Sequence, residues 1–111
     1  MMKSTYNQSN SYICSMSSQE ELLERLHELK ERLTRTYPIS SFALFGSYAR
    51  SEQTPESDID LLVELNGKIG SGFINLAEDL ESELGQKVDL VSKKGIKPRY
   101  LKAIESELIY V

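Results

Sequence analysis

A chain of 111 residues has room for one small domain and leaves no length for a second, substrate-binding domain. Its net charge of -4 argues against a general nucleic-acid binder, which usually carries a basic footprint, so we expect no direct nucleic-acid partner. The single cysteine, Cys14, excludes an internal disulfide framework and a cysteine-based zinc cluster. Because no apolar run reaches membrane-spanning length and no signal-peptide pattern is present, the sequence predicts a cytoplasmic protein without a membrane partner.

The N-terminal part of the chain divides into a polar segment and a helix. Residues 1 to 16 are rich in Ser, Asn, Gln and Tyr, which predicts a flexible N-terminal extension before a folded domain over residues 17 to 111. A serine pair with glutamates three residues further on has the spacing of a capping box, which begins a helix. Leucines at helical spacing follow, so a helix is expected to about Thr36, before Pro38.

Three short apolar runs predict strands. Residues 41 to 45 are apolar and end at Gly46, as expected for a buried strand. Residues 58 to 65 alternate between an apolar face and a face that begins with two aspartates, and residues 87 to 91 form the third run.

Three further helices are expected around these strands. A short helix begins at about Tyr48, a longer one ends at Gly85, and Pro98 begins the last. Residues 109 to 111 end the chain as a short strand or an extended tail. The order α-β-α-β-α-β-α predicts an α/β (α+β) fold, in which a small mixed β-sheet is flanked by helices.

A Gly-Ser pair stands between the first strand and the expected short helix. Helix N-termini offer unpaired N–H groups and a positive dipole end to phosphates. Gly46 lets the backbone approach a phosphate closely because it has no Cβ, and Ser47 adds a hydroxyl and a backbone N–H. Arg50 either reaches a phosphate or pairs with a nearby carboxylate, and the sequence leaves both roles open.

Three aspartates supply the complementary half of a phosphate site. Ten residues separate Ser47 from Asp58, and Asp58 and Asp60 stand at i and i+2 of a strand, so they share one face. Paired carboxylates suit Mg²⁺, and Asp89 on the neighbouring strand is placed to complete a second metal site and to receive the proton of an acceptor. Each motif alone is common, but the spacing and the strand context together favour transfer from a metal-bound nucleoside triphosphate.

Two other features allow a functional and a structural interpretation. The basic cluster of Lys93, Lys94, Lys97 and Arg99 is interpreted as a solvated loop in preference to a triphosphate contact. Tyr48 either stacks on a base or packs as an aromatic residue at a helix start.

These motifs resemble the nucleotidyltransferase superfamily related to DNA polymerase beta. Residues 46 to 50 and 57 to 63 match its G-S…D-x-D signature, and residues 88 to 91 match the strand that carries the third carboxylate. The compact size is similar to that of the minimal nucleotidyltransferases, the MNT family, whose members often act as antitoxins beside HEPN-domain toxins. The sequence departs from the family at Ser51, where members often carry glycine.

The resemblance implies an antitoxin that uses ATP and Mg²⁺, in a two-metal site, to transfer AMP onto a tyrosine of a HEPN toxin and so block its RNase activity. A homo-oligomer is also compatible with the sequence. The implied catalytic metal ligands are Asp58, Asp60 and Asp89, and the implied nucleotide-binding residues are Gly46, Ser47 and Arg50.

Two alternatives stay open. The chain is either an active transferase or a binding module with weak or lost catalysis, which neutralises its partner by covering a surface. A small-molecule nucleotidyltransferase of the antibiotic-modifying kind is the other alternative, but such enzymes generally need acceptor-binding structure for which this length leaves little room. The same lack of room favours an acceptor supplied by a partner protein.

Overall fold

The structure, a computed structural model, describes residues 18 to 111, so the expected extension over residues 1 to 16 lies outside the described part. No helix within residues 18 to 111 is both long enough and apolar enough to cross a membrane. The elements in chain order are α1 (Gln19–Thr36), β1 (Ile39–Phe45), β2 (Ile59–Leu65), α2 (Gly72–Leu84), β3 (Val88–Ser92), α3 (Pro98–Ile104), the 3₁₀ helix η1 (Glu105–Glu107) and β4 (Ile109–Tyr110).

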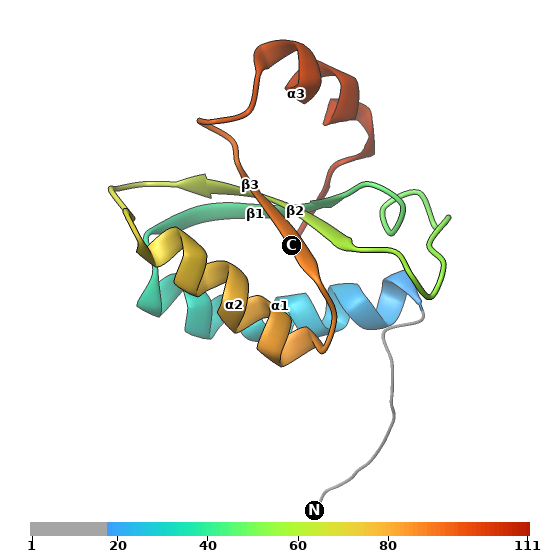
Figure 1. The fold of residues 1–111 in the computed structure, drawn as a ribbon, viewed down its shortest axis with the longest axis horizontal. Coiled ribbons are helices and arrows are strands. Elements are labelled where there is room, and N and C mark those ends of the chain that lie inside the picture. Colours follow the sequence, from blue (N-terminus) through green and yellow to red (C-terminus); the bar gives the residue numbers. More distant parts are fainter. Residues whose placement is uncertain (1–17) are drawn as a thin grey trace, which may run out of the picture.

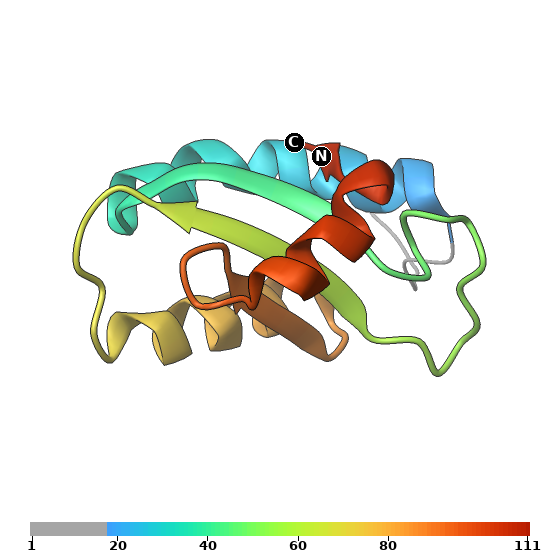
Figure 2. The ribbon, with the colours of Figure 1, turned by 90° about the horizontal axis from the view of Figure 1, so that it is seen from above.

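The strands form one mixed sheet of four, in the order β3-β2-β1-β4. β2 and β3 run parallel, whereas β1 is antiparallel to both β2 and β4. Figure 1 shows α1 and α2 together on one face of the sheet, and Figure 2 shows α3 crossing the opposite face. The predicted small mixed sheet flanked by helices is therefore confirmed.

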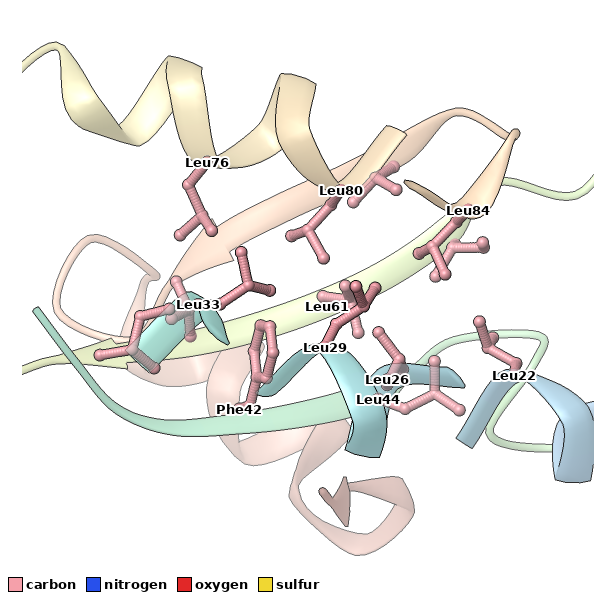
Figure 3. Close-up of a cluster of buried hydrophobic side chains, with 14 of the residues drawn as sticks. Leu22, Leu26, Leu29, Leu33, Phe42, Leu44, Leu61, Leu76, Leu80 and Leu84 are labelled. Atoms are coloured by element: carbon pink, nitrogen blue, oxygen red, sulfur yellow. The ribbon is translucent and has the colours of Figure 1, made fainter. Parts of the chain in front are cut away.

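The main hydrophobic core lies between the sheet and the helices α1 and α2 (Figure 3). The helical spacing of the leucines places them on one face of each helix, and burying each such side chain contributes about 1.5–3 kcal/mol. A smaller cluster lies under α3 on the other face of the sheet, and it includes Phe45, Leu62 and Ile104. The central strands β1 and β2 are thus covered on both faces. The buried helix leucines of the main core are Leu22, Leu26, Leu29, Leu33, Leu76, Leu80 and Leu84.

Most of the predicted helix ends are confirmed. The Ser18 side chain accepts a hydrogen bond from the Glu21 N–H at the start of α1, as the capping-box spacing predicted. Gly85 follows α2 with φ 69, the left-handed conformation that a glycine C-cap adopts readily. Pro98 begins α3, where its missing N–H costs no helical hydrogen bond.

The short helix expected from Tyr48 is wrong, because residues 47 to 51 form a turn. The Arg50 N–H donates to the Gly46 carbonyl over 3.1 Å, so a single helix-like turn does form. Ser51 then adopts φ 57, which takes the chain out of the right-handed path and towards β2. Ser51 is also the position where the sequence departs from the family glycine, and the structure shows the conformation that a glycine would favour.

Candidate active site

Gly46 directly follows β1, and it lies against the side chain of Asp60 on β2. A Cβ at Gly46 would come within 2.0 Å of Asp60 Oδ2, and the Gly46 φ of 79 is in the left-handed region. Glycine is therefore required here by the approach of the carboxylate and by the backbone conformation. The sequence predicts that Gly46 lets the backbone approach a phosphate closely. In the structure, the place that a Cβ would take lies against the Asp60 carboxylate.

The Gly-Ser turn is held in place from the side of α1. Gln19 Nε2 donates to the carbonyl oxygens of Tyr48 and Ala49, both over 2.9 Å. The Tyr48 side chain is only 2% exposed, and its hydroxyl accepts a hydrogen bond from Gln86 Nε2 over 2.9 Å. Tyr48 therefore packs in the core, and the alternative in which it stacks on a base is wrong. Sequence reasoning missed Gln19, since no local motif marks a residue that contacts a turn so far along the chain.

The aspartates converge at the end of the sheet that carries this turn. Asp60 pairs in register with Asp89 across the parallel strands β2 and β3, and with Phe45, directly before Gly46, across β1 and β2. Asp58 stands two residues earlier, just before β2 begins. Because successive strand residues face opposite sides, Asp60 and Asp89 lie on the α3 side of the sheet while their neighbours fill the main core. Asp89 is exposed, so its carboxylate can be ionised without a cost of burial, although it stands in an apolar run.

Asp60 is the electrostatically perturbed group of this cluster. Burial, the Asp89 carboxylate and the Asp58 carboxylate raise the pKa of Asp60 from 3.8 to about 6, in that order of importance. The Arg50 guanidinium acts in the opposite direction, and Glu107 adds further repulsion. Near neutral pH the Asp60 carboxylate is therefore ionised at a cost, which a nearby cation would relieve.

In the structure Arg50 pairs with carboxylates, which is one of the two roles that the sequence leaves open. Its Nε lies 3.0 Å from Glu52 Oε1, and its Nη1 lies 3.1 Å from Glu107 Oε1 and 3.2 Å from Glu107 Oε2. Glu107 Oε2 also accepts a hydrogen bond from the Gly46 N–H over 2.6 Å. Glu107, on η1, was not singled out in the sequence, because it belongs to no motif and lies 61 residues from Gly46.

Comparison with known proteins identifies the family. A model of the nucleotidyltransferase domain matches residues 26–111. The chain belongs to this family. A Methanocaldococcus jannaschii protein provisionally named protein adenylyltransferase MJ1379 is 49% identical over 100 residues, which cover 86% of this chain and 100% of the relative. Protein adenylyltransferase MntA of Thermococcus cleftensis is 37% identical over 99 residues, which cover 87% of this chain and 99% of MntA.

Solved structures place this nucleotidyltransferase among the minimal ones. A structure provisionally described as a minimal nucleotidyltransferase superposes with a TM-score of 0.71 and 33% identity, covering 83% of this chain and 94% of the other. A toxin–antitoxin crystal structure with AMP-PNP shares the fold at a TM-score of 0.62 and 22% identity, covering 83% of this chain and 70% of the other. A complex of tri-AMPylated Shewanella oneidensis HEPN toxin with MNT antitoxin does so at the same TM-score and identity, covering 79% and 69%. The family resemblance expected from the sequence is confirmed.

The carboxylates of the nucleotidyltransferase fit Mg²⁺ in their chemistry but do not form a ready-made cage. Hard carboxylate oxygens that share a face and repel one another are the donors that Mg²⁺ prefers. Yet in the described part of the chain, no three Asp, Glu, His or Cys side chains are positioned to hold a metal ion as they stand. Asp58, Asp60 and Asp89 would therefore need side-chain rotation, with phosphate oxygens and water completing the coordination.

The basic cluster begins away from the Gly-Ser turn of the nucleotidyltransferase. Lys93 Nζ lies 3.6 Å from Glu64 Oε1, and the Lys93 N–H donates to the Val63 carbonyl, so Lys93 adjoins the end of β2 opposite to Asp60. Lys94 and Lys97 are exposed in the same loop. These positions favour the interpretation as a solvated loop.

Proposed function

We propose that this nucleotidyltransferase is a Mg²⁺-dependent protein adenylyltransferase that transfers AMP from ATP to a hydroxyl group of a partner protein. The observation that carries the proposal is the placement of the Gly46 turn directly against Asp60, with Asp89 in register on the next strand. A phosphate-binding turn and three carboxylates at one end of a sheet are what transfer from a nucleoside triphosphate needs.

Each residue has a role in this proposal. The Gly46–Ser47 turn and Arg50 bind the triphosphate, and Asp58 and Asp60 would hold the metal ion. The acceptor oxygen bonds to the α-phosphorus while the bond to the bridging oxygen of the β-phosphate breaks, so that pyrophosphate leaves.

Asp89, an exposed residue of the edge strand β3, receives the acceptor's proton. When bound, Mg²⁺ neutralises phosphate charge and lowers the pKa of the acceptor hydroxyl.

We further propose that the acceptor is a HEPN-family RNase toxin, which the chain neutralises as an antitoxin. Support comes from the relatives named protein adenylyltransferases and from the fold shared with antitoxins in complex with HEPN toxin. The small size of the chain is consistent with an acceptor supplied by another protein.

The test is transfer of labelled AMP. The purified chain is incubated with labelled ATP, Mg²⁺ and the protein encoded next to it, and we expect label on that protein. The double variant Asp58→Ala with Asp60→Ala should lose the transfer, whereas Glu78→Ala, an exposed carboxylate change on α2, should keep it. No transfer by the wild-type protein, or equal transfer by the double variant, would contradict the proposal.

A second candidate function is neutralisation by binding alone. It is favoured by one observation, that no three-ligand metal group stands preassembled among residues 18 to 111. It predicts that a folded Asp58→Asn, Asp60→Asn variant still protects cells from the partner. Complete loss of protection by that variant would reject it.

A further inference from the structure

The Glu107 carboxylate is placed as an anion on the Gly-Ser turn. It accepts the Gly46 N–H over 2.6 Å, and both of its oxygens lie within 3.2 Å of Arg50 Nη1. The Glu107 side chain is 19% exposed and the Arg50 side chain 45%, so the hydrogen bond from Gly46 is partly buried while the contacts with Arg50 are open to water. Charge-assisted hydrogen bonds of this kind are about twice as strong as neutral ones.

The groups that hold Glu107 are the groups that a phosphate would use. A backbone N–H at a turn and a guanidinium are typical donors to phosphate oxygens, and they bind carboxylates in the same way. In the proposed function, Gly46 and Arg50 bind the triphosphate. A carboxylate and a phosphate oxygen cannot both take the Gly46 N–H, because the amide has one hydrogen.

Electrostatic repulsion adds to this competition for the Gly46 N–H. Burial and the carboxylates of Asp89 and Asp58 already raise the pKa of Asp60, and the Glu107 carboxylate also repels the Asp60 carboxylate. A triphosphate that enters while Glu107 stays in place would add several negative charges beside these carboxylates.

We propose that Glu107 is an internal competitor of the triphosphate: its carboxylate occupies the Gly46 N–H and the Arg50 guanidinium, and so sets the nucleotide affinity of the protein. The inference rests on the proposed function, because it takes the Gly-Ser turn as the triphosphate site. Glu107 ends η1, and β4, which begins two residues later, is held to β1 by the pairs Ala43–Tyr110 and Leu44–Ile109. Rotation of the Glu107 side chain therefore frees the turn while β4 stays paired.

The test measures nucleotide affinity by isothermal titration calorimetry, with Mg²⁺ and AMP-PNP as the probe. Glu107→Gln removes the charge but keeps an oxygen that can accept from Gly46, so we expect it to bind about tenfold more tightly, or about 1.4 kcal/mol. Glu107→Ala should bind at least as tightly as Glu107→Gln. The matched control is Glu105→Gln, an exposed glutamate of the same 3₁₀ helix, which should stay within about twofold of wild type. Thermal unfolding checks that each variant is folded.

The direction of the change separates competition from support of the turn. If Glu107 only braces the turn, its removal loosens the phosphate donors and weakens binding. Unchanged or weaker binding by Glu107→Gln, with wild type binding normally, overturns the inference and leaves the proposed function standing. If no folded version binds the probe, the nucleotide site itself is contradicted and the inference is overturned with it. A parallel titration with inorganic tripolyphosphate should show the same gain, because the competition concerns phosphates and not the base.

Discussion

Replacing Asp60 by asparagine should raise the free energy of unfolding at neutral pH. Burial and the neighbouring aspartates raise the pKa of Asp60 from 3.8 to about 6, so the folded protein holds this proton more tightly than the unfolded chain. The resulting contribution to stability is fully present below about pH 4 and is lost as the pH rises through 6. Asparagine has similar shape and no charge, so the variant escapes this loss.

The size of the effect follows from the pKa change. At about 1.4 kcal/mol per pKa unit, a rise from 3.8 to about 6 corresponds to an upper limit of about 3 kcal/mol. Asp60 is only half-buried, and solvent screens its repulsion by Asp58 and Asp89. We therefore expect Asp60→Asn to gain about 1–2 kcal/mol at pH 7.5 and close to nothing at pH 4.

The assay is urea unfolding at pH 4 and pH 7.5, with a chelator present to exclude metal binding. The matched control is Asp58→Asn. It removes the same charge from an exposed side chain two residues before Asp60, so its gain in the free energy of unfolding should be smaller. An equal gain at both pH values, or no gain at pH 7.5, would refute the reasoning. A gain by Asp58→Asn as large as that of Asp60→Asn would show that general charge, and not burial at Asp60, is responsible.

Three backbone and hydrogen-bond predictions concern the same turn, each measured by urea unfolding. Gly46→Ala should lower the free energy of unfolding by about 2–4 kcal/mol, because the new Cβ meets Asp60 and φ is positive. The control Gly95→Ala, whose Cβ would meet nothing closer than 3.8 Å, should lower it much less. Ser51→Gly should gain about 0.5–1 kcal/mol, since glycine relieves a left-handed φ at some entropic cost; a loss would contradict this. Gln19→Glu should lose about 1–3 kcal/mol, because a carboxylate cannot donate to the two turn carbonyls, and an unchanged stability would show that these bonds contribute nothing.

The elements that the sequence predicted are those that depend on neighbouring residues. Leucines at helical spacing before Pro38 define α1, and Gly85 in a left-handed conformation ends α2. The same is true of the meeting of Gly46, Asp60 and Asp89, since it needs only three strand assignments and the alternation of side chains along a strand. Local rules were sufficient because the sequence signals and the tertiary packing agree at these positions.

The features that the sequence did not predict depend on contacts between distant residues. Residues 47 to 51 are compatible with a helix, and the return of the chain into β2 decides for a turn. Gln19 and Glu107 both contact this turn from elements far away in the chain, with separations of 29 and 61 residues. Neither residue type is distinctive by itself, so no spacing rule could have selected them.

Two energetically unfavourable features of this fold lie at the end of the sheet that carries the Gly-Ser turn. Burial disfavours the ionised form of the Asp60 carboxylate, and Ser51 is the one non-glycine residue with positive φ in the described part of the chain. The main core carries no such electrostatic cost, since no charged residue is buried among residues 18 to 111. Strain that persists in one place points to function there, independently of any relative. The two costs are separable: we expect Asp60→Asn to gain stability and lose AMP transfer, because it removes a proposed metal ligand. Ser51→Gly should gain stability and keep transfer, because it relieves only the backbone.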